Sequence, residues 1–207
     1  MTHMKKTRRL VLTAFFVAIE LVLMLTPIGY IPIGPVRATT MHIPVILSSM
    51  LMGSGTGAFM GFVFGLTSLL KNTFEPTATS FVFSPFITIG GIHGNFASLL
   101  IVFVPRILMG WLSGTMYQFL KKKTGKDMLS CSISAAFNTI LHTVLVMGGI
   151  YVFFAEPYAA AQAIAADAVI GVIMAVIMSN GMIEMLMSAI VLPALVKALN
   201  PIMERMK

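Results

Sequence analysis

Two apolar stretches of the sequence each carry a line of polar side chains that could do chemistry. The lines are Ser134, Asn138 and His142 in residues 128–154, and Asn180, Glu184 and Ser188 in residues 168–199. Within each line the residues recur every four positions. At 3.6 residues per turn, each line therefore falls on one face of a helix.

Polar side chains inside an apolar helix usually face other helices or a ligand. The two lines predict either a ligand pocket between two neighbouring helices or hydrogen bonds that fix their packing. A third interpretation pairs Glu184 with His142 as acid and base of an intramembrane enzyme. No nucleophile or metal set accompanies them. The sequence also lacks a phosphate-binding loop, an H-E-x-x-H zinc motif and a G-x-S-x-G nucleophile turn. We therefore expect a protein that is not an enzyme.

A second group of polar residues lies near the ends of other apolar segments. These are Arg37, Thr39, Thr40, His42, Lys71, Asn72, His93 and Asn95. They could surround a pocket at the outer membrane boundary, where Arg37 or Lys71 would attract an anionic ligand group. The alternative is that the Lys71 side chain only reaches for the interface, and a lone histidine such as His93 at a helix end is usually structural.

One further cation, Arg106, lies inside an apolar run. It could pair with Glu20 of the first apolar segment, which is the interpretation we favour, or it could bind an anion. A charge within a membrane segment is costly and needs a partner.

The composition identifies the elements that must position these residues. Of the 207 residues, 57% are hydrophobic and 10% are charged, and the mean hydropathy is +0.94. Soluble domains carry about 25% charged residues. The single cysteine, Cys131, excludes an intrachain disulfide. We expect an all-α membrane protein forming one transmembrane domain over residues 1–207.

Apolar runs and helix breakers predict a bundle of six transmembrane helices. The expected helices cover residues 10–25, 42–52, 55–70, 96–120, 128–154 and 168–199. The second is short, since about 20 residues cross the hydrocarbon. Prolines make residues 27–40 a structured loop or a re-entrant cap. Residues 71–95 and 155–167 form the other outer connections, and Pro193 should bend or end the last helix.

The positions of the basic residues orient this bundle. Eleven of the fourteen lie before the first apolar run, in the cluster at residues 121–126, or after the last run. With six spans, all eleven fall on one side, which the positive-inside rule assigns to the cytoplasm. Both termini are therefore expected to be cytoplasmic. The basic residues flank membrane segments instead of gathering with aromatics on one face, which argues against nucleic acid as a partner.

Three segments resemble the substrate-binding S components of energy-coupling factor (ECF) transporters, which import vitamins into bacteria. The first is the spacing of Ala14 and Ala18 ahead of the proline-rich loop. The second is ATTMHIPVILSSMLMGSGTGAFMGFVFGLTSLL at residues 38–70. The third is FNTILHTVLVMGGIYVFF at residues 137–154 together with SNGMIE at residues 179–184. Together they span most of the chain.

The resemblance implies a mechanism and partners. An S component captures a vitamin from outside, with its first outer loop closing over the ligand. It then joins a membrane coupling subunit and two cytoplasmic ATPases, and topples to release the vitamin inside. ATP is hydrolysed by these partners, so no cofactor of its own is expected. Ala14 and Ala18 match the docking motif for the coupling subunit, although Val22 occupies the position of a third alanine.

Within the family, GPVRATTMHIP and the Asn-Gly-x-x-Glu of the last helix are most similar to pantothenate-type S components. From the chemistry of pantothenate we expect Arg37 or Lys71 to bind the carboxylate, and Asn138, His142, Asn180 and Thr40 to bind the neutral polar groups. Carriers for folate, riboflavin or hydroxymethylpyrimidine share the same scaffold. A carrier or channel that works without ATPases remains a further alternative.

Overall fold

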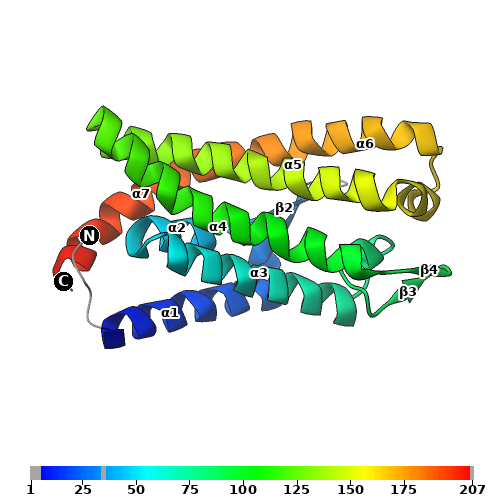
Figure 1. Cartoon of the computed structure of the whole chain (residues 1–207), viewed down its shortest axis with the longest axis horizontal. Coiled ribbons are helices and arrows are strands. Elements are labelled where there is room, and N and C mark those ends of the chain that lie inside the picture. The colour runs from blue at the N-terminus through cyan, green and yellow to red at the C-terminus, as the bar shows by residue number, and fades with distance from the viewer. Residues whose placement is uncertain (1–5, 34–35, 206–207) are drawn as a thin grey trace.

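The computed structural model describes residues 6–33 and 36–205, apart from the side chains of residues 30–38 and 205. Seven helices account for most of the chain (Figure 1). They are α1 (Lys6–Leu25), α2 (His42–Met52), α3 (Ser54–Phe74), α4 (Phe96–Thr124), α5 (Asp127–Gln162), α6 (Val169–Val176) and α7 (Met182–Arg205). A π-helical turn at Ile177–Gly181 joins α6 to α7 into one long rod.

The connections at one end of the bundle contain two short antiparallel hairpins. In the first, β1 (Tyr30–Ile33) pairs with β2 (Val36–Thr39) between α1 and α2. In the second, β3 (Thr88–Ile89) pairs with β4 (Ile92–His93) between α3 and α4. The proline-rich segment that was expected to be a structured loop is therefore largely this first hairpin.

Most expected helix boundaries are confirmed, and two are wrong. The expected loop at residues 155–167 is helical as far as Gln162, because α5 only kinks at Phe154, whose φ of −138° and ψ of 20° are not helical. The chain leaves the helix at Ala163, in a left-handed conformation. The last helix runs past its expected end at residue 199 to Arg205, so Pro193 does not end it.

Three helical segments of the described chain are long and apolar enough to cross a membrane: Phe96–Thr124, Asp127–Gln162 and Ala166–Glu204. Helices α1 and α3, of 20 and 21 residues, reach a comparable length, but α1 begins with a basic cluster. The chain is thus a helical membrane protein. The number of spans and the side on which the termini lie stay predictions.

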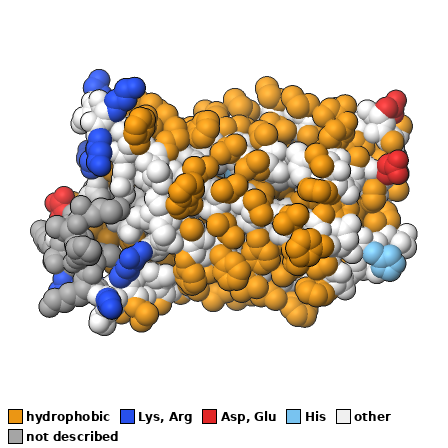
Figure 2. All heavy atoms as spheres, in the orientation of Figure 1, with side chains coloured by type: hydrophobic (Ala, Val, Ile, Leu, Met, Phe, Trp, Pro, Cys, Tyr) orange, Lys and Arg blue, Asp and Glu red, His pale blue; other side chains and the backbone are white. Residues whose placement is uncertain are grey.

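The surface divides into three zones along the bundle (Figure 2). Most visible Lys and Arg side chains gather at the end where α1 begins and α7 ends, and a wide apolar belt follows. At the opposite end, acidic side chains appear beside the junction of α5 and α6, and a histidine side chain appears beside the β3–β4 hairpin; one further acidic side chain is visible at the basic end. This distribution is typical of a protein that spans a bilayer.

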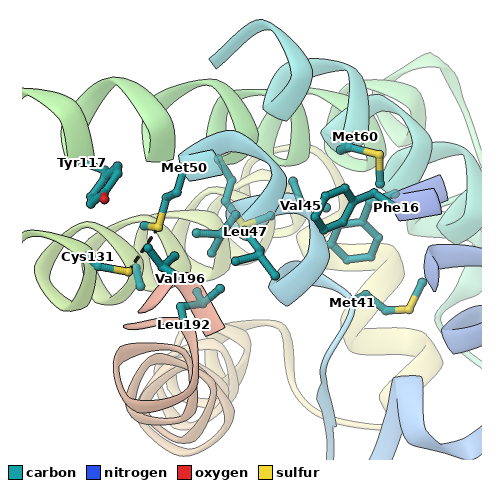
Figure 3. Close-up of a cluster of buried hydrophobic side chains, with 14 residues drawn as sticks. Phe16, Met41, Val45, Leu47, Met50, Met60, Tyr117, Cys131, Leu192 and Val196 are labelled. Atoms are coloured by element: carbon teal, nitrogen blue, oxygen red, sulfur yellow. Dashed lines mark hydrogen bonds between the residues drawn. The ribbon is translucent and has the colours of Figure 1, made fainter. Parts of the chain in front are cut away.

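Two apolar clusters fill the interior. The first joins α1, α2, α3 and α7 at the basic end and includes Phe16, Met41, Val45 and Leu192 (Figure 3). Cys131 belongs to it, and its thiol lies 3.4 Å from the sulfur of Met50, so this cysteine is packed, as expected. The second cluster lies at the hairpin end and brings Phe81 and Val82 of the connection between α3 and α4 against α5 and α6.

Helices α3 and α4 approach closely because glycines line their seam. A side chain at Gly57 would collide with the backbone of Gly110, and one at Gly61 with the carbonyl of Arg106. Small residues allow such close approach of membrane helices. The seam therefore sets where the Arg106 backbone lies relative to α3.

Candidate functional site

A cavity of about 210 Å³ lies in the half of the bundle that carries the hairpins. Helices α3, α4, α5 and α7 line it together with the π turn and the end of β2. Its polar lining residues are Thr39, Ser68, Arg106, His142, Thr143, Asn180 and Glu184. Its apolar lining residues are Phe64, Phe83, Val146, Met147 and Val176. A largely apolar pocket with a few convergent polar groups is the usual form of a small-molecule site.

Arg106 supplies the cation of this cavity. Its side chain is 6% exposed. Nη1 donates to the carbonyls of Ile101 and Val102 at 3.0 and 3.1 Å, and Nη2 donates to Ser68 Oγ at 3.3 Å. The guanidinium also lies 4.9 Å from the centre of the Phe64 ring. These contacts hold it in one orientation, as recognition of a planar anionic group requires.

The ion pair that we favoured between Glu20 and Arg106 does not form as a hydrogen-bonded pair. Glu20 is fully buried, and neither of its carboxyl oxygens has a hydrogen-bond partner among the described residues. Because Arg106 lines the cavity instead, the alternative role as an anion site gains weight. Its place inside an apolar run was the available signal.

The polar residues on α5 divide between the two interpretations given above, a ligand pocket and hydrogen bonds that fix helix packing. His142 lines the cavity, with its ring centre 5.9 Å from that of Phe64. Ser134 instead donates to the carbonyl of Ser113 at 2.8 Å. Asn138 is buried away from the cavity and donates to the carbonyl of Ser134 at 2.8 Å. One end of the line therefore faces a pocket and the other end helps to pack α5 on α4.

The polar line on the last rod divides in the same way. Asn180 lies in the π turn and lines the cavity. Glu184, one turn further, also lines the cavity, and its Oε1 accepts a hydrogen bond from the Thr39 amide at 2.6 Å. The hydroxyls of Ser188 and Thr139 lie 2.8 Å apart and link α7 to α5. A π turn often marks a functional site, because it changes the face that a helix presents.

Four of the other expected site residues lie outside this cavity. Lys71 forms an ion pair of 2.5 Å with Glu75 on the same helix. Asn72 accepts a hydrogen bond from Ser80 at 2.7 Å, which ties α3 to the following connection. Asn95 caps α4 through a capping box. His42 is buried, and neither ring nitrogen has a hydrogen-bond partner in the described part of the chain.

Two expected residues belong to the first hairpin or its edge. Thr40 is buried beside the cavity residue Thr39, but its hydroxyl donates to the carbonyl of Ile28 at 2.8 Å. The Arg37 side chain lies outside the described residues. Sequence reasoning placed Thr39 at the expected outer pocket, and Thr39 lines the cavity. It did not name Ser68 or Thr143, because hydroxyl residues are frequent in membrane helices and their direction depends on helix rotation.

The described residues contain no group of three or more His, Cys, Asp and Glu side chains placed to hold a metal ion. The cavity instead combines one guanidinium, one imidazole, one amide, one carboxyl and several hydroxyls with an apolar wall. This set suits a small anionic molecule that also carries polar and branched apolar groups.

Comparison with known proteins gives a consistent result. Residues 8–196 match the family described as "ECF transporter, substrate-specific component". The chain is 36% identical over 208 residues to the pantothenic acid transporter PanT of Lactococcus lactis subsp. cremoris (strain MG1363), with 95% of this chain and 99% of that protein covered. It is 28% identical over 207 residues to the pantothenate transporter PanT of Leuconostoc mesenteroides subsp. mesenteroides, with 97% and 96% covered.

Proposed function

Since this chain belongs to the family of ECF transporter substrate-specific components, we propose that it binds pantothenate at the cell membrane for import. The two relatives named as pantothenate transporters support this vitamin over others that the scaffold serves. The observation that carries the proposal within the molecule is the cavity with Arg106 in its wall.

Pantothenate fits the chemistry of this cavity. It has a carboxylate at one end, an amide in the middle, and two hydroxyls beside a pair of methyl groups. Arg106 would bind the carboxylate, because a guanidinium can form two parallel hydrogen bonds with it. His142, Thr143 and Asn180 would meet the amide and the hydroxyls, while Val146 and Val176 would contact the methyl groups. The volume of about 210 Å³ suits a ligand smaller than a typical drug.

Arg106 is a better candidate for the carboxylate than the two residues proposed from the sequence. Lys71 is paired with Glu75 and does not line the cavity. Arg37 remains a competing candidate from the first hairpin. We keep the proposal that five further residues contact the ligand in the bound state: Thr40, His42, Asn72, Asn95 and Asn138.

We further propose six membrane spans, formed by α1 to α5 and the α6–α7 rod, in a single domain with both termini in the cytoplasm. The gathering of basic side chains at one end of the bundle supports this orientation (Figure 2). The cavity would then lie in the outer half of the membrane, under the first hairpin.

The proposed partners are a membrane coupling subunit and two cytoplasmic ATPases. Ala14 and Ala18 both lie on the exposed face of α1, where a partner helix could approach closely. ATP hydrolysis would belong to the ATPases, and this chain would need no cofactor and perform no catalysis. Vesicles that hold the chain alone should therefore take up no pantothenate under an ion gradient.

Binding of pantothenate and of pantothenol to the purified protein tests this function. Pantothenol replaces the carboxylate with an alcohol. A hydrogen bond to a charged group contributes about 1.5–3 kcal/mol, so wild-type protein should prefer pantothenate by about 10- to 100-fold. The R106Q variant should lose this preference, because it lacks the guanidinium.

The matched controls are K71Q and R37Q. We expect K71Q to bind pantothenate with wild-type affinity. If R37Q abolished the preference for pantothenate while R106Q kept it, the carboxylate site would belong to the hairpin and not to α4. Failure of wild-type protein to bind pantothenate at all, with another vitamin found in the purified sample by mass spectrometry, would overturn the choice of substrate.

A further inference from the structure

A short hydrogen bond beside the cavity ties the end of the first hairpin to α7. The backbone amide of Thr39 donates to Glu184 Oε1 at 2.6 Å. The two residues lie 145 positions apart in the chain, and both line the cavity. We propose that Glu184 latches the β1–β2 hairpin over the cavity and thereby slows the release of the bound ligand. This inference rests on the proposed function.

The hairpin is held together by its own hydrogen bonds. Its strands pair from Tyr30 with Thr39 to Ile33 with Val36. At its base, Thr40 donates through its amide to the carbonyl of Gly29 at 3.2 Å and through its hydroxyl to that of Ile28 at 2.8 Å. These bonds close the hairpin on itself. The bond from Thr39 to Glu184 reaches the helical bundle instead.

The Thr39 amide needs an acceptor from outside the hairpin. It lies on the strand edge that faces the π turn and α7, which β2 contacts. An edge amide away from water is costly when it has no acceptor, and a carboxyl oxygen is among the strongest acceptors available. Loss of the Glu184 carboxyl would therefore favour a hairpin position in which water reaches the amide.

Glu184 is held in place by its own helix. One turn further along α7, the Ser188 hydroxyl bonds with that of Thr139 on α5. Ser188 also donates to the carbonyl of Glu184 at 2.7 Å. Since α7 is fixed to α5 here, the hairpin is the partner that moves when the bond breaks. This assigns Glu184 a positioning role, distinct from contact with the ligand.

Hydrogen exchange in ligand-free protein tests the latch directly. In E184A, the amides of residues 36–41 should exchange about tenfold faster than in wild-type protein, because Thr39 loses its acceptor. The E184Q variant keeps an acceptor oxygen and should restore most of the protection. Unchanged exchange in folded E184A would overturn the latch, whether or not the protein binds pantothenate.

Release of radiolabelled pantothenate tests the effect on the ligand. We expect E184A to raise koff about tenfold, equivalent to about 1.4 kcal/mol, with a smaller change in kon. The T39P variant removes the donor without altering α7 and should raise koff similarly, and it serves if E184A does not fold. The double variant should release ligand no faster than the faster single variant, because both changes break one bond.

Additive effects of E184A and T39P on koff would overturn the shared bond. A change confined to kon in E184A would overturn the proposal that Glu184 slows ligand release. If wild-type protein bound no pantothenate, the proposed function would fail, and faster exchange in ligand-free E184A would still support the attachment of the hairpin by Glu184.

Discussion

Helices α1 and α3 both place small residues four positions apart, but the two faces lie in opposite environments. On α3, Gly57, Gly61 and Gly65 are buried against α4. On α1, Ala14 and Ala18 are exposed, and large apolar side chains such as Phe15 and Val22 are exposed beside them. With the same spacing, the small residues of α3 pack against another helix of the chain, whereas those of α1 stay exposed on the surface.

The packing around the two helices also differs: it is tight along α3 and leaves grooves beside α1. Along the α3–α4 seam, no side chain fits at Gly57 or Gly61 without moving backbone atoms. Beside α1, two apolar grooves of about 410 and 370 Å³ are each lined by Phe15 and Phe16 of α1 and Leu199 of α7. Small residues at this spacing predict that another helix approaches closely. The spacing does not show whether that helix belongs to the same chain or to a partner subunit.

The largest effect should come from filling the seam. We expect G61L to yield no stable folded protein, because its Cβ would collide with the carbonyl of Arg106 and the rest of the leucine side chain would have to force the two helices further apart. G61A should fold with a cost of about 1–3 kcal/mol for overpacking, which corresponds to a melting temperature lower by about 2–12 °C. It should also bind pantothenate more weakly, because Arg106 is displaced. Thermal unfolding in detergent and ligand binding measure both effects.

A seam that tolerated G61L, with unchanged melting temperature and affinity, would show that α3 and α4 are not packed this closely. The comparison between the two helices would then lose its basis.

An intermediate effect should come from filling the exposed face of α1. We expect the A14L/A18L double variant to fold and to bind pantothenate normally, since neither alanine is buried. Uptake with the coupling subunit and ATPases should fall by about tenfold or more, equivalent to about 1.4 kcal/mol, because bulk blocks the partner helix. Uptake into vesicles that contain the complete transporter measures this.

The A175L variant is the matched control, because Ala175 is an exposed alanine on α6. It should transport at the wild-type rate. Equal losses in A175L and A14L/A18L would show that added bulk in the lipid-facing surface, and not a docking face on α1, limits uptake.

The smallest effect should come from a glycine without a packing role. Gly148 lies within α5, and nothing lies within 4 Å of a Cβ placed there. G148A should stabilise the protein by about 0.5–1 kcal/mol, because alanine favours a helix over glycine. A rise in melting temperature of about 1–4 °C is expected. A fall like that of G61A would mean that helix glycines are required generally, and not at the seam alone.

Much of the fold followed from local patterns. The bounds of α2, at residues 42–52, were predicted as they are, because the glycines on one side and the proline-rich loop on the other interrupt the apolar run. The kink in α5 lies at Phe154, where that helix was expected to end. The continuation of this helix through Pro157 was missed, because proline usually breaks a helix. Proline is tolerated in the first turn after a kink, since a backbone amide there needs no hydrogen-bond acceptor within the helix.

Part of the cavity lining was predicted from the sequence. Three of the residues proposed from the sequence, His142, Asn180 and Glu184, meet at one cavity, while Lys71 and Asn95 serve local structure. Arg106 was considered, but the pairing with Glu20 was favoured. Sequence spacing shows which residues share a helix face, but it cannot show which neighbour that face meets.

The sequence alone determined that this is a helical membrane protein and to which family it is similar, because hydropathy, helix breakers and flanking charges act locally along the chain. Only the tertiary structure decided which polar residues converge. That outcome depends on how each helix is rotated, and residues one position apart point about 100° apart. The glycine seam sets this rotation for α3 and α4, and the π turn sets it for the last rod.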